Sequence, residues 1–352
     1  MKIVEGIIDQ YLAVVWEQKG SDLHLTTESA PRGRVDGRLR PIEGAPILTG
    51  EMIWEALEAT LNQHQIKRLR DRHEVDFSFS WRGTARIRAN AFLQKGEPAL
   101  ALRVIPSDIP SFETLGLPAA VQAFTSMTQG LVLFTGPTGS GKSTSLASLI
   151  NKINATRPLH ILTIEDPVEY VHSHKMSAIS QREVGADSVS FAFALRSALR
   201  EDPDVILVGE MRDPESIAIT LTLAETGHLV FSTLHTNDTS QALDRMVDVF
   251  PPEQQEQIRV QLAGALSAVV AQRLIVKKGG GRVAAFEVLI ASPAVRNLIR
   301  EGKTRQIRNM LVTGQGMGMQ TLEMSLNTLV KRGLITNEDA MAIALVPTEI
   351  GR

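Results

Sequence analysis

A glycine-rich segment near the middle of the chain contains residue types that bind the phosphates of a nucleotide. Residues 136–143 read GPTGSGKS, a full match to the pattern G-x-x-x-x-G-K-[ST]. The glycines let successive backbone N–H groups turn toward phosphate oxygens. Lys142 would reach the β- and γ-phosphates of ATP, and the Ser143 hydroxyl would bind Mg²⁺. The ATP-binding residues expected in this segment are Gly136, Pro137, Thr138, Gly139, Ser140, Gly141, Lys142, Ser143 and Thr144.

Acids and histidines that suit ATP hydrolysis adjoin other apolar runs. Glu165 follows ILTI, and Glu210 follows VILVG. Either carboxylate could accept the proton of the attacking water or orient a metal-bound water, so the choice of general base stays open between them. Both acids could instead cap helix N-termini. His228 and His235 flank LVFSTL. We expect His228 to bind nucleotide and His235 to act in catalysis, although each could simply join strands by hydrogen bonds.

The surrounding pattern predicts the elements that hold these residues. The apolar run at 131–134 is short enough for a buried strand, and apolar residues recur at helical spacing from Leu146 to Ile153. Further short apolar runs at 160–165, 205–210 and 228–234 alternate with helical patterns, which predicts a doubly wound parallel sheet. Ligands bind beyond the carboxyl ends of such strands, so the glycine-rich loop, acids and histidines should converge on one sheet edge.

The first hundred residues predict a separate, smaller α+β domain. A helical pattern opens the chain, alternating strands surround the turn dipeptide Asp36-Gly37, and residues 51–69 again follow a helical pattern. The proline-rich stretch after Ile105 indicates a linker. We therefore expect domains at 1–106 and 118–352, joined by a linker at 107–117. After Phe250 the chain should be mostly helical, with one strand at 283–290.

Composition excludes several classes of protein. With no cysteine among 352 residues, disulfides, thiol nucleophiles and cysteine-ligated zinc are impossible. His172 and His174 lack a third ligand nearby in sequence, which favours plain loop residues over a metal site. The 37 basic and 39 acidic residues give no basic excess for a nucleic-acid partner. The longest apolar candidate, 262–276, is interrupted by charge, and no signal peptide is evident, so we expect a cytoplasmic protein without a membrane span.

Taken together, the motifs resemble those of the hexameric secretion and type IV pilus ATPases over nearly the whole chain. SDLHLT at 21–26 resembles the family's N-terminal signature, and GPTGSGKST its Walker A motif. ILTIEDPVEY is similar to its Asp box, LREDPDVILVGEMRD to its Walker B segment with Glu210 in place of the usual Asp, and TGHLVFSTLHTNDT to its His box. AVRNLIRE at 294–301 resembles the motif of the retraction branch, and the missing cysteines disfavour the zinc-bearing extension branch.

The resemblance implies an α/β fold with a RecA-like ATPase domain after a PAS-like domain, assembled as a homohexamer that hydrolyses ATP with Mg²⁺ to drive pilus retraction. It implies that Arg86, Arg88 and Arg103 sense phosphate, with Arg200 and Arg212 as further candidates. The expected partners are an inner-membrane pilus platform protein and a sister pilus ATPase, with the ring lying at the pilus base. We expect Arg296 and Arg300 to offer charge to a partner or to the neighbouring domain rather than to the core.

Three other functions stay open at this point. The chain could be a pilus-extension or type II secretion ATPase within the same family. It could be a nucleic-acid translocase on the same core, which the missing basic excess disfavours. It could also be a slowly hydrolysing, nucleotide-controlled regulator of a sister motor. Dependence of the hydrolysis rate on hexamer formation would separate the last two from a ring motor.

Overall fold

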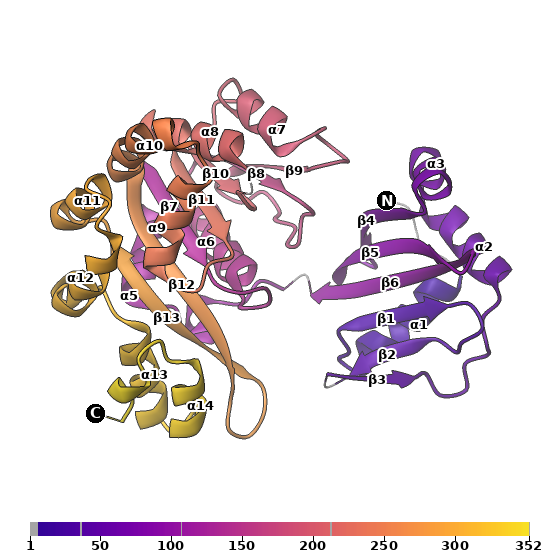
Figure 1. The fold of residues 1–352 in the computed structure, drawn as a ribbon. Coiled ribbons are helices and arrows are strands. Elements are labelled where there is room, and N and C mark those ends of the chain that lie inside the picture. Colours follow the sequence, from indigo (N-terminus) through magenta and orange to yellow (C-terminus); the bar gives the residue numbers. More distant parts are fainter. Residues whose placement is uncertain (1–5, 36, 107, 212, 352) are drawn as a thin grey trace. The chain divides into compact units, whose positions relative to one another are not determined.

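The computed structural model describes residues 6–35, 37–106, 108–211 and 213–351 (Figure 1). Its contacts divide the chain into two compact units. The first contains Met1–Asp108 together with Pro167–Val171, and the second contains Ile109–Asp166 together with His172–Arg352. Residues 109–117, which the sequence analysis assigns to a linker, thus group with the second unit. Phe112 and Leu115 in this stretch pack against its apolar core, which explains why the stretch does not behave as a free linker.

The first unit is built on an antiparallel sheet with the strand order β3-β2-β1-β6-β5-β4. Its strands are β1 (Asp22–Thr26), β2 (Arg32–Val35), β3 (Arg38–Pro41), β4 (Glu74–Trp81), β5 (Ala85–Gln94) and β6 (Glu97–Pro106). Alternate residues such as Leu23, Ile87 and Leu102 are buried, whereas the residues between them face away from the core. The predicted antiparallel domain is confirmed; Asp36 of the predicted hairpin turn lies outside the described residues.

Three helices cover the buried face of this sheet: α1 (Ile7–Glu17), α2 (Gly50–Thr60) and α3 (Gln63–Arg72). The predicted opening helix is confirmed, and Ile8 and Leu12 bury its apolar side. The single helix expected over 51–69 is wrong, because Asn62 starts a new helix there. Its side chain accepts from the Gln65 amide while the Gln65 side chain accepts from the Asn62 amide, a capping box that fixes the start of α3.

The second unit is built on a seven-stranded sheet with the order β13-β12-β7-β11-β10-β8-β9. Its strands are β7 (Gly130–Thr135), β8 (His160–Glu165), β9 (Ala178–Glu183), β10 (Val205–Val208), β11 (Leu229–Leu234), β12 (Leu266–Val276) and β13 (Arg282–Ile290). All neighbours pair in parallel except β12 and β13, so the predicted parallel sheet is confirmed. The expectation of a mostly helical C-terminal part misses β12, whose burial on both faces leaves no alternating pattern to read.

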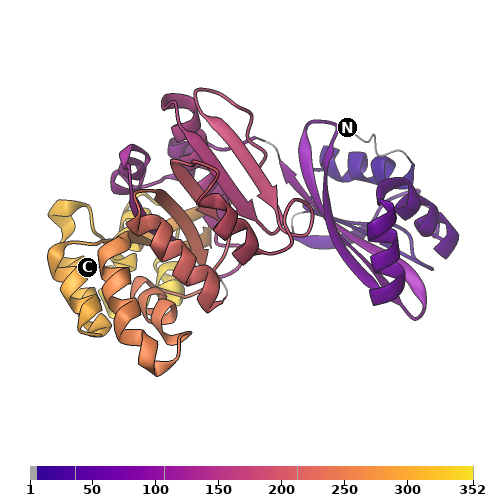
Figure 2. The ribbon, with the colours of Figure 1, turned by 90° about the horizontal axis from the view of Figure 1, so that it is seen from above.

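Helices cover both faces of the second sheet (Figure 2). Short α4 (Phe112–Leu115) and α5 (Ala119–Gln122) lie with α6 (Lys142–Thr156) on one face. The opposite face carries α7 (Phe191–Ala198), α8 (Pro214–Glu225), α9 (Thr239–Asp248), α10 (Pro252–Ala265), α11 (Pro293–Arg300) and α12 (Ile307–Thr313). None of the helices in the described part of the chain is long and apolar enough to cross a membrane.

The C-terminal helices α13 (Leu322–Lys331) and α14 (Asn337–Ile343) cover the outer part of the β12 and β13 pair. They also occupy the free edge of β13. Gln320 exchanges two backbone hydrogen bonds with Val288, at 2.9 and 3.1 Å, and Phe286 donates its N–H to Ser325 Oγ at 3.0 Å. The Gln320 side chain donates to the Phe286 carbonyl at 2.9 Å. The hydrogen-bonding groups of this stretch of the edge strand are thus satisfied by the chain itself.

Candidate active site

The glycine-rich loop at 136–143 joins β7 to α6 as its sequence predicts. Gly136, Gly139 and Gly141 have φ values of 145°, 77° and 90°, which favour glycine. At Gly136 a Cβ would lie 2.4 Å from the Gln272 carbonyl oxygen, and at Gly141 it would lie 2.8 Å from Gln272 Nε2. Two of the glycines are therefore needed for close approach as well as for backbone conformation, and the loop ends at the positive N-terminus of α6.

The side chains of the loop fit a bound phosphate. Lys142 is buried and its Nζ donates to the Gly136 and Pro137 carbonyls at 2.6 and 3.2 Å. The buried Ser140 hydroxyl makes no hydrogen bond to any described part of the chain. A buried hydroxyl that the chain leaves without a partner is available to donate to a bound anion. Ser143 and Thr144 are half-buried in the first turn of α6.

A residue that the sequence analysis did not single out holds this loop in place. Gln272 on β12 is buried, and its Oε1 accepts a hydrogen bond from Ser145 Oγ of α6 at 2.9 Å. Its backbone and side chain are the atoms that would collide with a Cβ at Gly136 and Gly141. No local motif marks Gln272, and only recognition of β12 as the neighbour of β7 would have found it.

Glu210 and His235 meet at the ends of adjacent strands. Val208 of β10 is paired with Ser232 of β11, so the residues just after the two strands lie side by side. His235 Nε2 is 3.3 Å from Glu210 Oε1, and both side chains are partly exposed. Because β11 lies between β10 and β7, the pair also lies beside the end of the strand that carries the phosphate loop.

Glu165 reaches the same edge from β8. Its Oε1 accepts from Thr163 Oγ1 at 2.7 Å and from Gln181 Nε2 at 3.4 Å. Gly209 donates its N–H to the Ile164 carbonyl, and a Cβ at Gly209 would lie 3.2 Å from Glu165 Cα. The missing side chain at Gly209 thus lets the chain before Glu210 pass close to Glu165. We call the loop at 136–143 together with Glu165, Glu210 and His235 the catalytic edge.

His228 lies elsewhere in this chain, contrary to the expectation that it binds nucleotide. Its backbone carbonyl accepts from Gly130 at the start of β7, and its Nδ1 is 2.9 Å from the Leu223 carbonyl. The seven residue steps from His228 to His235 span the whole of β11, roughly 23 Å at strand rise. The two histidines of one sequence block therefore lie at opposite edges of the sheet, and this chain does not bring His228 to the loop.

The structure brings the three predicted arginines of the first unit onto one face of its sheet. Arg34, Asp22, Arg103 and Arg88 form a single row across four strands. Arg86 lies two residues before Arg88 and so points to the same side, where it donates to Ser78 Oγ. We call Arg34, Arg86, Arg88 and Arg103 the arginine face. Of the two other candidates, Arg200 is exposed after α7, and Arg212 lies outside the described residues.

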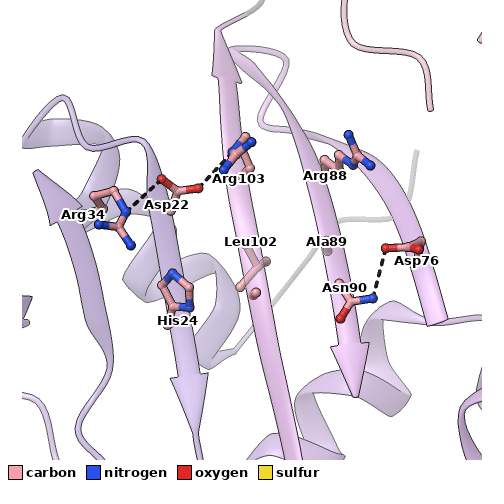
Figure 3. A pocket seen from close by; sticks show the side chains of 10 residues that line it. Asp22, His24, Arg34, Asp76, Arg88, Ala89, Asn90, Leu102 and Arg103 are labelled. Atoms are coloured by element: carbon pink, nitrogen blue, oxygen red, sulfur yellow. Dashed lines mark hydrogen bonds and ion pairs between the residues drawn. The ribbon is translucent and has the colours of Figure 1, made fainter. Parts of the chain in front are cut away.

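A shallow pocket of about 300 Å³ opens on the arginine face (Figure 3). Asp22 lies between two cations, with Oδ1 2.9 Å from Arg103 Nε and Oδ2 3.5 Å from Arg34 Nε. Burial opposes ionisation of Asp22, but hydrogen bonds from Ser21 and Arg103 outweigh it and hold the pKa of Asp22 below its ordinary value. Burial lowers the pKa of the neighbouring His24, because it disfavours the charged imidazolium. Asp22 thus stays charged and orients two of the arginines, while Arg88 is exposed.

The expectation that Arg296 offers its charge to a partner is wrong. Its Nε donates to the Ala291 carbonyl at 3.0 Å, and its Nη1 donates to the carbonyls of Ala263 and, at 2.6 Å, Gly264. The carbonyls of Ala263 and Gly264 belong to the last turn of α10, where backbone oxygens lack helical partners, so Arg296 caps the C-terminus of that helix. Arg300 is exposed and donates to Asn297 on its own helix. Only Arg300 remains as the outward charge that the sequence predicts.

The two histidines excluded as a metal pair do different things in the structure. His174 Nδ1 accepts from the Ile179 N–H at 3.0 Å, whereas burial lowers the pKa of His172 to about 4. In the described ranges no group of three or more His, Cys, Asp or Glu residues could hold a metal ion.

The chain is similar in sequence and in fold to known secretion and pilus proteins. The family profile described as Type II/IV secretion system protein matches residues 1–280. The chain is 53% identical over 311 residues to a twitching motility protein of Neisseria gonorrhoeae, covering 88% of this chain and 83% of that protein. It is 48% identical over 340 residues to the type IV pilus retraction ATPase PilT of Pseudomonas aeruginosa, covering 97% and 98%. A crystal structure of the pilus retraction motor PilT with bound ADP superposes with a TM-score of 0.91, at 49% identity, covering 98% and 99%.

Proposed function

Because the chain belongs to the family of type II/IV secretion system proteins, we infer that it is an ATPase whose hydrolysis of ATP drives retraction of a type IV pilus. One observation carries this conclusion. The phosphate loop, two glutamates and a histidine meet at one edge of the parallel sheet, in a chain that matches a retraction ATPase over nearly its full length.

ATP binding falls to the loop between β7 and α6. We propose that Lys142 exchanges its contacts with the Gly136 and Pro137 carbonyls for oxygens of the β- and γ-phosphates. The unpartnered Ser140 hydroxyl would gain a phosphate acceptor. Ser143, at the start of α6, would hold Mg²⁺, which supplies positive charge against the phosphate oxygens. The donors present thus fit a nucleotide with its magnesium ion.

Activation of the attacking water falls to Glu210 in this proposal. Its carboxylate contacts His235, which can orient it and share a proton with it. Glu165 accepts from Thr163 and Gln181, which suits a carboxylate that is held still to orient a metal-bound water. We therefore propose Glu210, through its contact with His235, as general base and Glu165 as the orienting acid, a choice that the sequence leaves open.

The arginine face suits the completion of a site in an assembly. The catalytic edge contributes Lys142 as a cation, whereas the transition state of phosphoryl transfer spreads charge over several oxygens. We propose that six subunits form a ring in which the arginine face of one meets the nucleotide of another. Exposed Arg88 and the Asp22-oriented Arg103 would then contact phosphate. We further propose that the ring acts in the cytoplasm on an inner-membrane platform protein of the pilus, with a sister pilus ATPase as a possible companion.

The other candidate functions are less well supported. A chain without cysteine cannot build the tetracysteine zinc element usual in extension ATPases. Its 37 basic and 39 acidic residues give no excess for tracking a nucleic acid. A slowly hydrolysing regulator would have less need for a glutamate and histidine in contact at the end of the sheet.

The proposal is tested by measuring how the rate of ATP hydrolysis depends on the fraction of chains assembled as hexamers. The purified chain should hydrolyse ATP with Mg²⁺ at a rate per subunit that rises with the hexamer fraction seen by light scattering. Added DNA should not stimulate it. The gene should restore twitching to cells that lack their own retraction ATPase. A rate independent of assembly would contradict the ring, stimulation by DNA would favour a translocase, and an active hexamer that fails to restore twitching would contradict the role in retraction.

A further inference from the structure

The segment that carries His235 is fastened at three points to the strands beside it. Thr236 contacts Thr135 at the end of β7, with 2.7 Å between their hydroxyl oxygens. Asn237 accepts two hydrogen bonds from Arg273 Nη2 of β12, at 3.0 and 3.2 Å. Thr239, the first residue of α9, is fastened to β13. Three neighbouring strands thus determine where this short segment runs.

The third fastening is a buried carboxylate with no other assigned role. Glu287 of β13 is 2% exposed, and its Oε1 accepts from both the backbone N–H and the hydroxyl of Thr239, at 2.9 and 2.8 Å. Glu287 is paired with Ala271 of β12, and Ala271 with Thr135 of β7, so the first and third fastenings lie in one row across the sheet. The row faces α9, since Leu133 and Leu289 pack with Leu243 of that helix.

Such a carboxylate is costly to keep. Burial raises the pKa of Glu287, and nearby Asp238 and Glu323 add to the shift, while the two hydrogen bonds from Thr239 oppose it. The ionised form is therefore disfavoured by the fold, and stability is lost as pH rises through this raised pKa. An apolar residue would avoid that penalty but would leave the Thr239 donors buried and unsatisfied. The contact to Thr239 is what the carboxylate provides.

We propose that Glu287 is a positioning residue, which sets the start of α9 and thereby holds His235 against Glu210. This inference rests on the proposed ATPase function and deepens it. Only three residues separate His235 from Thr239, so a shift at the helix start reaches the imidazole with little slack. The contact at stake is the 3.3 Å approach of His235 Nε2 to Glu210 Oε1. A misplacement of about 1 Å at a reacting group can lower a rate about 10²-fold.

Substitutions at Glu287 separate positioning from folding. Glu287→Ala should lower kcat for ATP about tenfold or more in the assembled protein, with KM for ATP changed less than about twofold, because the phosphate loop is held by other residues. Glu287→Gln keeps an acceptor oxygen and removes the buried charge, so it should retain kcat within about threefold and be at least as stable near neutral pH. Thr239→Val removes one of the two donors, so its kcat should lie between those of Glu287→Ala and Glu287→Gln. This variant keeps the test available if Glu287→Ala does not fold.

A buried acid elsewhere provides the matched control. Glu323 is 1% exposed and bonds Arg308 and the Val346 N–H rather than Thr239, although its charge is near enough to raise the pKa of Glu287. Glu323→Ala should lower the Tm and leave kcat nearly unchanged. The proposal is overturned if Glu287→Ala keeps parental kcat, if Glu287→Gln is as slow as Glu287→Ala, or if the loss appears in KM. Glu210→Gln in the same assay isolates the premise, since its full activity would instead refute the proposed catalytic edge.

Discussion

The catalytic edge and the arginine face build polar sites from the same materials in different ways. In the catalytic edge, eight consecutive residues form the phosphate loop, and the remaining groups lie at or just after the carboxyl ends of parallel strands. In the arginine face, the row of Arg34, Asp22, Arg103 and Arg88 takes one residue from each of four antiparallel strands. The residues of the phosphate loop are consecutive in the sequence, whereas the residues of the arginine row come from separate strands that pairing brings together.

This difference determines how each site tolerates change. The loop depends on local backbone, with glycine φ values and the start of α6 fixed within a few residues. The arginine row depends on strand register and on one acid, Asp22, that holds two cations. We therefore expect single substitutions to abolish the work of the catalytic edge, whereas the arginine face should lose function in steps.

Lys142→Ala should have the largest effect. No other residue of the loop can place a positive charge against the β- and γ-phosphates, so ATP hydrolysis should fall on the order of 10³-fold or more. The fold should survive, because the substitution shortens one side chain and leaves the glycine backbone of the loop unchanged. Steady-state phosphate release, with circular dichroism as the control, measures this. Hydrolysis within a few fold of the parent would make the assignment of the phosphate loop wrong.

Glu210→Gln should come next. The substitution keeps the shape but removes the proton acceptor, so ATP binding should persist while turnover falls by ~10²-fold or more. Glu165→Gln should also be severe, but through orientation rather than proton transfer, so its rate should respond more strongly to the choice of Mg²⁺ or Mn²⁺. Trapped nucleotide and single-turnover rates distinguish the two variants. If Glu210→Gln turned over rapidly, the general base would have to be sought at Glu165.

Arg88→Ala should have a smaller effect that appears only in the assembly. Loss of one charge-assisted hydrogen bond to phosphate costs about 1.5 kcal/mol at the low end, which suits an exposed side chain and corresponds to about a tenfold fall in hexamer turnover. Arg103→Ala should cost a similar amount, and the double variant more than either. Hydrolysis per subunit at matched hexamer fraction measures this. Equal loss in hexamers and in isolated subunits would contradict the idea that the arginine face serves a neighbour.

Arg300→Ala should have the smallest effect on hydrolysis and tests a segment outside both sites. The exposed guanidinium bonds Asn297 of its own helix among the described residues, so ring assembly and ATPase activity should stay within about twofold of the parent, as for other exposed substitutions. Twitching should nevertheless fail if this helix transmits work to the pilus. Arg296→Ala is the matched comparison: loss of its bonds to α10 should cost about 2 kcal/mol of stability. Normal twitching by Arg300→Ala would remove the proposed transmission.

The sequence predicts the residues of the catalytic edge far better than it predicts the residues of β12 and β13 that hold them in place. The motif at 136–143 and the acids after ILTI and VILV need only local reading, because parallel strands bring their carboxyl ends together. His228 shows why resemblance to a whole motif does not place each of its residues. The strand β11 separates His228 from His235 and puts them at opposite edges of the sheet. The outward charge expected at Arg296 is absent for a similar reason, because helical spacing gives a face but not the neighbouring helix end that the guanidinium caps.

The strand β12 explains most of what the sequence analysis could not predict. It follows α10 with no intervening residue, and a run buried on both faces has neither strand nor helix periodicity. Gln272 and Arg273 are on this strand, and Glu287 pairs with it from β13. The supports of the phosphate loop and of the His235 segment therefore come from chain that lies more than a hundred residues after the motif, with no local signature of their own.

The covered edge of β13 has a consequence for how the protein is made. Its free N–H and C=O groups at Phe286 and Val288 are met by Gln320 and Ser325. During synthesis at about 5–20 residues per second, roughly two to seven seconds separate the edge strand from its cover. For that interval a nascent chain offers a bare strand edge to any neighbour on the same messenger. Where many chains are translated close together, this sheet is most exposed to mispairing on the ribosome rather than in the finished protein.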